Sequence, residues 1–294
     1  MSDVTILVVE GNSPDLLSRD AEGRWQGAAE QYKDRLQAYA PAARFEIIRP
    51  HFPDFSLTQI AFDQFDGFAF TGSGVAWSAS DKAATPACQV MEKALATGRP
   101  VIGSCYGMQL GVAVLGGVVG PNPAEAELAI APSIHLTNAG KAHALFAGKP
   151  PIFDALCMHS DDCLEVPSGM VRLAGNDHCA WQAGILDQGG VRFFGVQYHP
   201  ELEFRHIAGY LRRSQVDQFS KPDSLARHAG IAELTASEAA ADFDRLQADP
   251  HAADLTAKYK ISESLTDRAC HERELANWMG WVADHAKQTE AARP

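Results

Sequence analysis

Apolar residues alternate between two patterns over the first two thirds of the chain. A short continuous apolar run is typical of a strand in a parallel sheet that is covered on both faces, and one occurs at residues 4–10; residues 44–48, 65–72 and 100–103 are read as further strands. The segments between them place apolar residues at helical spacing, as in 25–39 and 86–95. Strand followed by helix, repeated, predicts an α/β fold with a doubly wound, mostly parallel sheet flanked by helices.

The pattern changes twice further along. Short strand-like segments dominate from about residue 118 to 200, at 127–136, 170–175, 178–186 and 191–198. Beyond Phe204 glycine becomes sparse. Near the end of the chain one apolar stripe at helical spacing is formed by Leu275, Trp278, Met279 and Val282. We therefore expect a catalytic domain over 1–204 and a helical C-terminal extension over 205–294, with Lys221-Pro222-Asp223 as a joint.

Composition excludes several function classes. The formal net charge is −12 and no block of basic residues stands out, so neither nucleic acid nor an anionic membrane is an expected partner. No apolar run approaches the ~18 residues of a membrane span. Six scattered cysteines without an export signal favour a cytoplasmic protein with reduced thiols. The cysteines and histidines between 157 and 179 lack zinc-site spacing, and no nucleotide fingerprint is present, so we expect no metal and no cofactor.

One cysteine stands where a nucleophile would. The sequence Gly103-Ser104-Cys105-Tyr106-Gly107 joins a predicted strand to a predicted helix. A nucleophile at such a sharp turn needs small neighbours, which is the reason for the G-x-S-x-G elbow of serine hydrolases. The start of the following helix favours negative charge on the sulfur. A buried structural cysteine is the alternative that the elbow alone leaves open.

A base for this cysteine follows about ninety residues later. In "GVQYHPEL" the strand ends at Val196, so His199 should emerge at the rim of the sheet, with Glu201 two residues on. A histidine can accept the thiol proton, and a carboxylate on its other ring nitrogen fixes its orientation. Cys105, His199 and Glu201 are thus candidates for a catalytic triad.

Taken together, these motifs resemble those of class I glutamine amidotransferases. "GSCYGMQ" and "GVQYHPE" are similar to the nucleophile and histidine motifs of the glutaminase domain of GMP synthetase. The intervening "FTGSG", "HLTNAGKAHALFAG" and "MHSDDCLEVP" match family landmarks in order, and the resemblance covers roughly residues 4–204. The opening "VVEGNSPDL" and the serine in "TGSG" look more like stand-alone members such as γ-glutamyl peptidases.

The resemblance implies a role for each matching residue. Cys105 would form a γ-glutamyl thioester with glutamine or a γ-glutamyl amide, His199 would carry the proton to the leaving group, and Glu201 would hold His199. The backbone amides of Ser73 and Tyr106 would stabilise the oxyanion. Further positions match the family's substrate pocket: Gly72, Gln109, Glu127, His159, Ser160 and Asp161.

Two enzymatic hypotheses and one non-enzymatic hypothesis follow. The first is a glutaminase that passes ammonia to a separate synthetase or acceptor subunit, since residues 205–294 contain no ATP-binding motif. The second is a free-standing hydrolase of γ-glutamyl peptides or amides. The third is a regulatory binding protein on the same fold, against which the intact triad argues. The helical extension could serve self-association, so a homo-oligomer is a further expectation.

Overall fold

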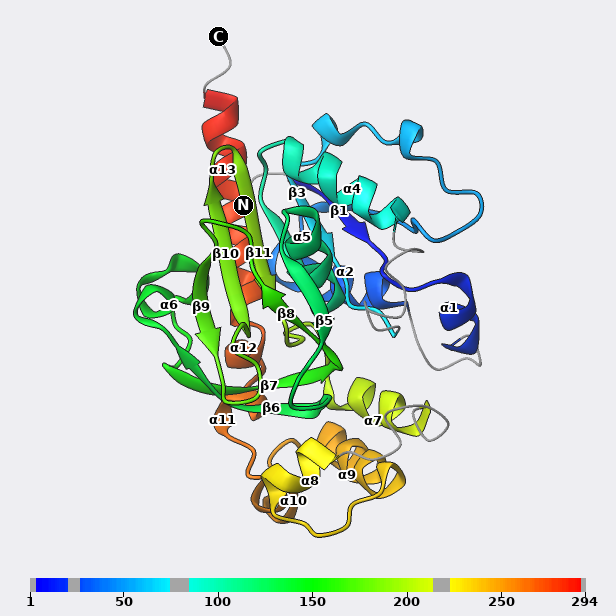
Figure 1. Cartoon of the computed structure of the whole chain (residues 1–294), viewed down its shortest axis with the longest axis vertical. Coiled ribbons are helices and arrows are strands. Elements are labelled where there is room, and N and C mark those ends of the chain that lie inside the picture. The colour runs from blue at the N-terminus through cyan, green and yellow to red at the C-terminus, as the bar shows by residue number, and fades with distance from the viewer. Residues whose placement is uncertain (1–3, 21–26, 75–84, 214–222, 292–294) are drawn as a thin grey trace.

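A nine-stranded sheet forms the centre of the molecule, with helices on both of its faces (Figure 1). The computed structural model describes residues 4–20, 27–74, 85–213 and 223–291. The strand order is β2-β1-β3-β4-β11-β10-β9-β6-β7. These strands are β1 (Thr5–Val9), β2 (Arg44–Ile48), β3 (Gly67–Phe70), β4 (Val101–Ser104), β6 (Glu127–Leu136), β7 (Ile152–His159), β9 (Val171–Gly175), β10 (Ala183–Gln188) and β11 (Val191–Val196).

The sheet has a parallel half and an antiparallel half. Strands β2, β1, β3, β4 and β11 run parallel, and β10, β9, β6 and β7 continue the sheet antiparallel. The predicted α/β sheet with flanking helices is confirmed. The carboxyl ends of β3, β4 and β11 meet at one edge, so the residues that follow them are brought together there.

Three strands were not predicted: β7, and the two-stranded sheet of β5 (Val118–Pro121) with β8 (Asp161–Glu165). β5 contains glycine and proline and β8 begins with two aspartates, all of which are depleted in strands. These two segments form strands because they hydrogen-bond to each other, although their own residues do not favour a strand.

The two sides of β1 face two different apolar layers. Ile6 and Val8 pack into the cluster that holds Trp278, whereas Leu7 and Val9 pack into the other cluster. All of these side chains are buried. Helices on the first side are α2 (Ala28–Tyr39) and α13 (Arg273–Ala291), and those on the second are α4 (Thr85–Ala96) and α5 (Tyr106–Val114).

The C-terminal helices pack in two places. A third apolar cluster joins the first helices after residue 203 to β6 and β7, and α13 returns to the main sheet (Figure 1). Lys149 and Glu274, both without exposed side-chain surface, form an ion pair of 2.9 Å that fastens α13. Asp223 begins α8, while residues 221 and 222 of the predicted joint lie outside the described residues. The remaining bounds are α7 (Phe204–Arg213), α8 (Asp223–Ala229), α9 (Ala236–Ala248), α10 (Ala253–Lys258), α11 (Glu263–Thr266) and α12 (Arg268–His271).

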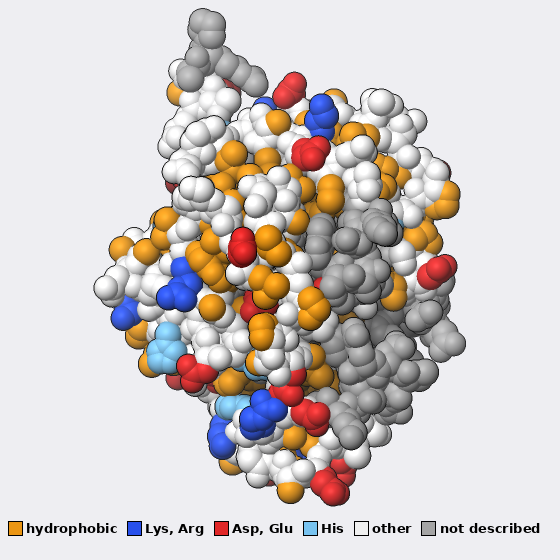
Figure 2. Space-filling view, in the orientation of Figure 1, with side chains coloured by type: hydrophobic (Ala, Val, Ile, Leu, Met, Phe, Trp, Pro, Cys, Tyr) orange, Lys and Arg blue, Asp and Glu red, His pale blue; other side chains and the backbone are white. Residues whose placement is uncertain are grey.

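Shorter elements complete the described part of the chain. They are α1 (Pro14–Asp20), α6 (Asn138–Ala142) and 3-10 turns at Leu57–Gln59, Phe62–Gln64 and Ala144–Phe146. Figure 2 shows apolar side chains scattered among polar ones on the face that carries β5, β8, β9 and β10. Val118, Leu164 and Val171 of these strands are about half exposed. Within the described ranges no helix has both the length and the apolarity to cross a membrane.

Candidate active site

Cys105 stands at a strained elbow between β4 and α5. Its φ of 50° lies in the left-handed region that residues other than glycine rarely adopt. The neighbouring chain is packed so closely that a Cβ on Gly103 would lie 2.4 Å from the carbonyl carbon of Gly107. The Cys105 side chain is 4% exposed, and its Sγ lies 3.6 Å from the carbonyl oxygen of Met158. Gly103 therefore has no room for a side chain, which agrees with the predicted need for small residues next to Cys105.

His199 and Glu201 lie beside this cysteine. His199 Nδ1 is 2.6 Å from Glu201 Oε1, and the Cys105 side chain interacts with the same imidazole. Burial alone would lower the pKa of His199, but the carboxylate of Glu201 and the contact with Cys105 raise it to about 10. The raised pKa favours the imidazolium form, whose positive charge would stabilise negative charge on a neighbouring sulfur. The structure places Cys105, His199 and Glu201 next to one another, and their catalytic roles stay a prediction.

The turn after β3 lies against the imidazole. A Cβ on Gly72 would be 2.5 Å from His199 Cε1, so the ring packs directly on the Gly72 backbone. Ser73 is the next residue of this turn, and Tyr106 is the first residue of α5. Tyr106 thus follows Cys105 directly, and Ser73 follows the glycine that contacts His199. Gly72, predicted from the resemblance as a pocket residue, contacts the base.

A buried charged network lies beneath the elbow. His159 Nε2 is 2.9 Å from Glu127 Oε2, and Glu127 also accepts hydrogen bonds from Asn176 at 2.8 Å and Gln182 at 2.7 Å. Burial alone would raise the pKa of Glu127 and lower that of His159, but their mutual contact reverses both shifts. His159 Nδ1 lies 3.1 Å from the carbonyl oxygen of Asp161. Both ring nitrogens of His159 are thus engaged within the protein.

Gln109 links this network to α5. Its Nε2 donates to the carbonyl oxygen of Asp161 at 3.0 Å and to Gln197 Oε1 at 3.2 Å. Ser160 lies in the turn between β7 and β8, and its carbonyl oxygen accepts from the Asn122 amide at 2.8 Å. Five of the predicted pocket residues, Gln109, Glu127, His159, Ser160 and Asp161, therefore occupy one connected region.

Several members of this region escaped the sequence analysis. Gln197 stands inside the quoted "GVQYHPE" motif, so its position next to His199 was a usable signal. Gln182 and Asn176 carry no such signal, because only the pairing of β10 with its neighbours brings them to Glu127. Glu10 and Asn12 were likewise not predicted; Asn12 bonds the turn at 71–74, and Glu10 bonds Asn12.

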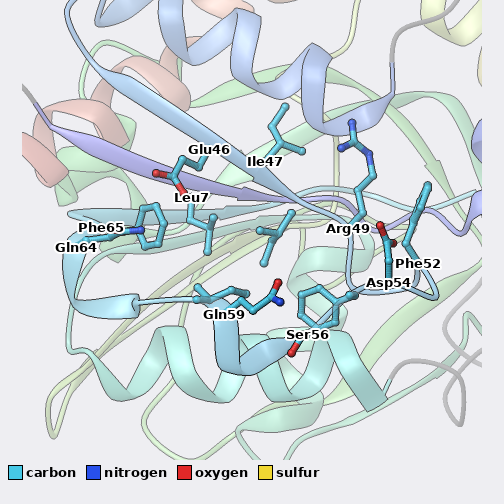
Figure 3. A pocket seen from close by; sticks show the side chains of 13 residues that line it. Leu7, Glu46, Ile47, Arg49, Phe52, Asp54, Ser56, Gln59, Gln64 and Phe65 are labelled. Atoms are coloured by element: carbon cyan, nitrogen blue, oxygen red, sulfur yellow. The ribbon is translucent and has the colours of Figure 1, made fainter.

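A pocket of about 590 Å³ lies elsewhere, along β2 and the segment that connects it to β3 (Figure 3). Its floor is apolar, with Leu7 and Phe65, and Glu46, Arg49 and Gln59 are among its polar lining residues. No predicted site residue lines it. The candidate chemistry is therefore assigned by side-chain geometry at the cysteine elbow, and this pocket is not part of it.

The cysteines show no metal arrangement in the part of the chain that the structure describes. All six are free thiols, and no three His, Cys, Asp or Glu side chains gather there as a metal site would require. Cys179, within the segment considered for zinc, instead donates to Asp162 Oδ1 at 3.1 Å. Burial raises the pKa of the Cys179 thiol well above its ordinary value.

Comparison with known proteins gives consistent matches. The family model for "Glutamine amidotransferase class-I" matches residues 37–214. A γ-glutamyl-L-1-hydroxyisopropylamide hydrolase from a Pseudomonas species is 32% identical over 219 residues, which cover 73% of each chain. A glutamine-hydrolysing GMP synthase from Shewanella baltica is 35% identical over 115 residues, which cover 38% of this chain but only 22% of that enzyme. The solved structure of a glutamine amidotransferase from Thermotoga maritima, 14% identical, superposes with a TM-score of 0.54 over 97% of this chain and 98% of that one.

Proposed function

The chain belongs to the class I glutamine amidotransferase family, and we propose that it hydrolyses the amide bond of γ-glutamyl amides through a thioester on Cys105. The family and its activity on glutamine or γ-glutamyl amides rest on the matches above. The observation that carries the assignment to Cys105 is its strained elbow beside an imidazole that Glu201 holds at 2.6 Å.

We assign the chemical steps to groups at this elbow. The Cys105 thiolate attacks the γ-carbonyl carbon, and the amides of Ser73 and Tyr106 receive the resulting oxyanion. The His199 imidazolium gives its proton to the leaving nitrogen, so the C–N bond breaks and a γ-glutamyl thioester remains. His199 then takes a proton from water, whose oxygen attacks the thioester. Glutamate leaves, and the thiolate and imidazolium are restored.

The connected pocket residues would hold the γ-glutamyl group. We assign the contacts with that group to Gln109 and to the turn at Ser160 and Asp161. Glu127 and His159 have side chains only 1% exposed. We propose that these two act through the Asp161 carbonyl and Gln109 rather than by touching substrate.

The leaving group is the point on which two functions differ. Likeness across 73% of both chains to a hydrolase of a γ-glutamyl alkylamide supports release of an amine into water. The second candidate is a glutaminase that delivers ammonia to a separate acceptor enzyme. Its support is the shorter match to a GMP synthase, and the matched segment covers only 22% of that enzyme.

The test measures both reactions with one preparation. Purified protein is assayed for ammonia release from glutamine and for isopropylamine release from γ-glutamylisopropylamide, with Cys105→Ala as the inactive control. Cys88→Ala is the matched control, because Cys88 is a half-buried thiol on α4 away from the elbow. Cysteine-dependent amine release that exceeds ammonia release by tenfold or more supports the hydrolase. Ammonia release that rises only on adding a synthetase supports the second candidate. No turnover of either substrate, with Cys105 unreactive, refutes both.

We also propose a cytoplasmic location, with the catalytic groups in residues 1–204 and a supporting role for the helices of 205–294. Six unpaired cysteines support the location. Cell fractionation with a periplasmic marker tests it, and light scattering of the purified chain tests the expected homo-oligomer.

A further inference from the structure

The loop that follows β1 is bonded to the turn that carries the proposed oxyanion donor. Asn12 Oδ1 accepts a hydrogen bond from the Gly74 amide at 2.8 Å, and the Gly11 amide donates to Thr71 Oγ1 at 2.9 Å. The two backbones are so close that a Cβ on Gly11 would lie 2.6 Å from the Gly72 carbonyl oxygen. The loop and the turn are therefore held against each other by hydrogen bonds and by close backbone contact.

The loop that follows β1 is itself held by the buried carboxylate of Glu10. Glu10 is 0% exposed, and its carboxylate accepts three hydrogen bonds from N–H donors among the described residues. Oε1 accepts from the backbone and side-chain N–H groups of Asn12 at 3.0 and 2.8 Å, and Oε2 accepts from the Ala29 amide at 2.8 Å. Ala29 lies in the first turn of α2, where the helix dipole favours a negative charge. Burial raises the pKa of Glu10, while the hydrogen bonds from Ala29 and Asn12 act in the opposite direction, because N–H donors favour the ionised carboxylate.

Glu10 also decides which way the Asn12 amide faces. Since Asn12 Nδ2 donates to Glu10, Oδ1 must face the Gly74 amide. On the other side of Ser73, Thr71 Oγ1 donates to the Gly72 carbonyl at 2.9 Å. Ser73 is therefore fixed on both flanks, on one side by Thr71 and on the other by Asn12.

We infer that Glu10 and Asn12 are positioning residues that aim the Ser73 amide at the developing oxyanion. This inference rests on the proposed thioester chemistry, since it concerns the donor used in that reaction. Neither residue touches the reacting atoms. Both act through the backbone of the turn, in which Gly74 is tethered to Asn12 while Gly72 packs on the imidazole of His199.

The decisive variant is Asn12→Ala, which removes the tether to Gly74 and leaves the Thr71 contacts in place. Displacement of a donor by about 1 Å lowers rates by about 100-fold, so kcat for a γ-glutamyl amide should fall by about 10- to 100-fold with KM nearly unchanged. Alkylation of Cys105 by iodoacetamide forms no oxyanion, so its rate should stay within twofold of wild type. The matched control is Asn277→Ala on α13, which deletes two hydrogen bonds to the backbone carbonyls of Leu145 and Ala147, neither of which is a predicted site residue.

A second variant and a second readout keep the inference falsifiable. Glu10→Gln replaces one accepting carboxylate oxygen with an NH2 group, which faces an N–H donor and cannot accept its hydrogen bond. The loop is then held less firmly, so kcat should fall in the same way as in Asn12→Ala. Hydrogen exchange of the peptide covering 70–74 should be faster in Asn12→Ala than in Asn277→Ala, and exchange over 101–110 should be unchanged. Equal kcat in both asparagine variants, or unchanged exchange at 70–74, overturns the inference. If wild type releases no amine from any γ-glutamyl amide, the proposed function fails, while the exchange result still decides whether the tether holds the turn.

Discussion

Replacing Gly72 with alanine should disable the base without touching it chemically. The added Cβ would lie 2.5 Å from His199 Cε1, whereas non-bonded carbons settle at about 3.5–4.0 Å. The imidazole must therefore withdraw by about 1 Å, because the backbone of the turn is tied to the loop after β1. A displacement of about 1 Å corresponds to roughly 100-fold in rate, or about 2.7 kcal/mol of barrier.

Gly74→Ala is the control for this change within the same turn. Its Cβ would meet its nearest neighbours, Asn12 and Leu16, at 3.6 Å, which is ordinary contact. Neither Gly72 nor Gly74 has a positive φ, so alanine strains the backbone at neither position. The comparison therefore isolates the contact with the ring.

The assay combines kcat and KM for γ-glutamyl-p-nitroanilide with the rate of Cys105 alkylation by iodoacetamide. Gly72→Ala should lower kcat by about 100-fold and slow alkylation, since both depend on the placement of His199. A rise in KM alone would instead mark Gly72 as a substrate-binding residue, as the sequence resemblance implied. Values of kcat within threefold of those of Gly74→Ala would refute the steric reasoning.

Three further changes probe the charges of the site and of its support. Glu201→Gln removes the carboxylate that raises the pKa of His199 to about 10, so an NMR titration of that ring should show a midpoint well below this value, with kcat reduced at least about tenfold. Glu127→Gln breaks a buried pair and should lower the free energy of unfolding by about 3 kcal/mol in urea titrations. Because the pKa of Glu127 is lowered and that of His159 raised, the loss should be greatest between pH 4.5 and 6.5, shrinking below as the glutamate protonates and above as the histidine deprotonates. Lys149→Met leaves the buried α13 carboxylate unpaired, so urea unfolding should show a loss of about 3–5 kcal/mol, part of which returns when that carboxylate is also neutralised.

The alternation of strands and helices was readable because each element carries its own signal. The apolar runs that became β1 and β4 are buried in the sheet, the segment 44–48 forms its partly exposed edge strand β2, and the helical stripe from Leu275 to Val282 packs against the sheet. Strands β5 and β8 were missed because the glycine and proline of β5 and the two aspartates of β8 oppose strand formation locally. Only the pairing of each with the other makes them strands.

The chemistry of the site divides in the same way. By itself the sequence determined that a cysteine, a histidine and a glutamate occupy the positions of a known family's nucleophile, base and orienting group, because each sits in a short contiguous motif. It gave no sign that Glu10 and Asn12, sixty residues before Gly74, would tie down the turn beside them. Those contacts join segments distant in the chain, and hydrogen bonds of this kind have no periodicity that a single sequence could display. The identity of the reacting groups was therefore local information, whereas their alignment is a property of the tertiary structure, which alone sets the distances over which charge and contact act.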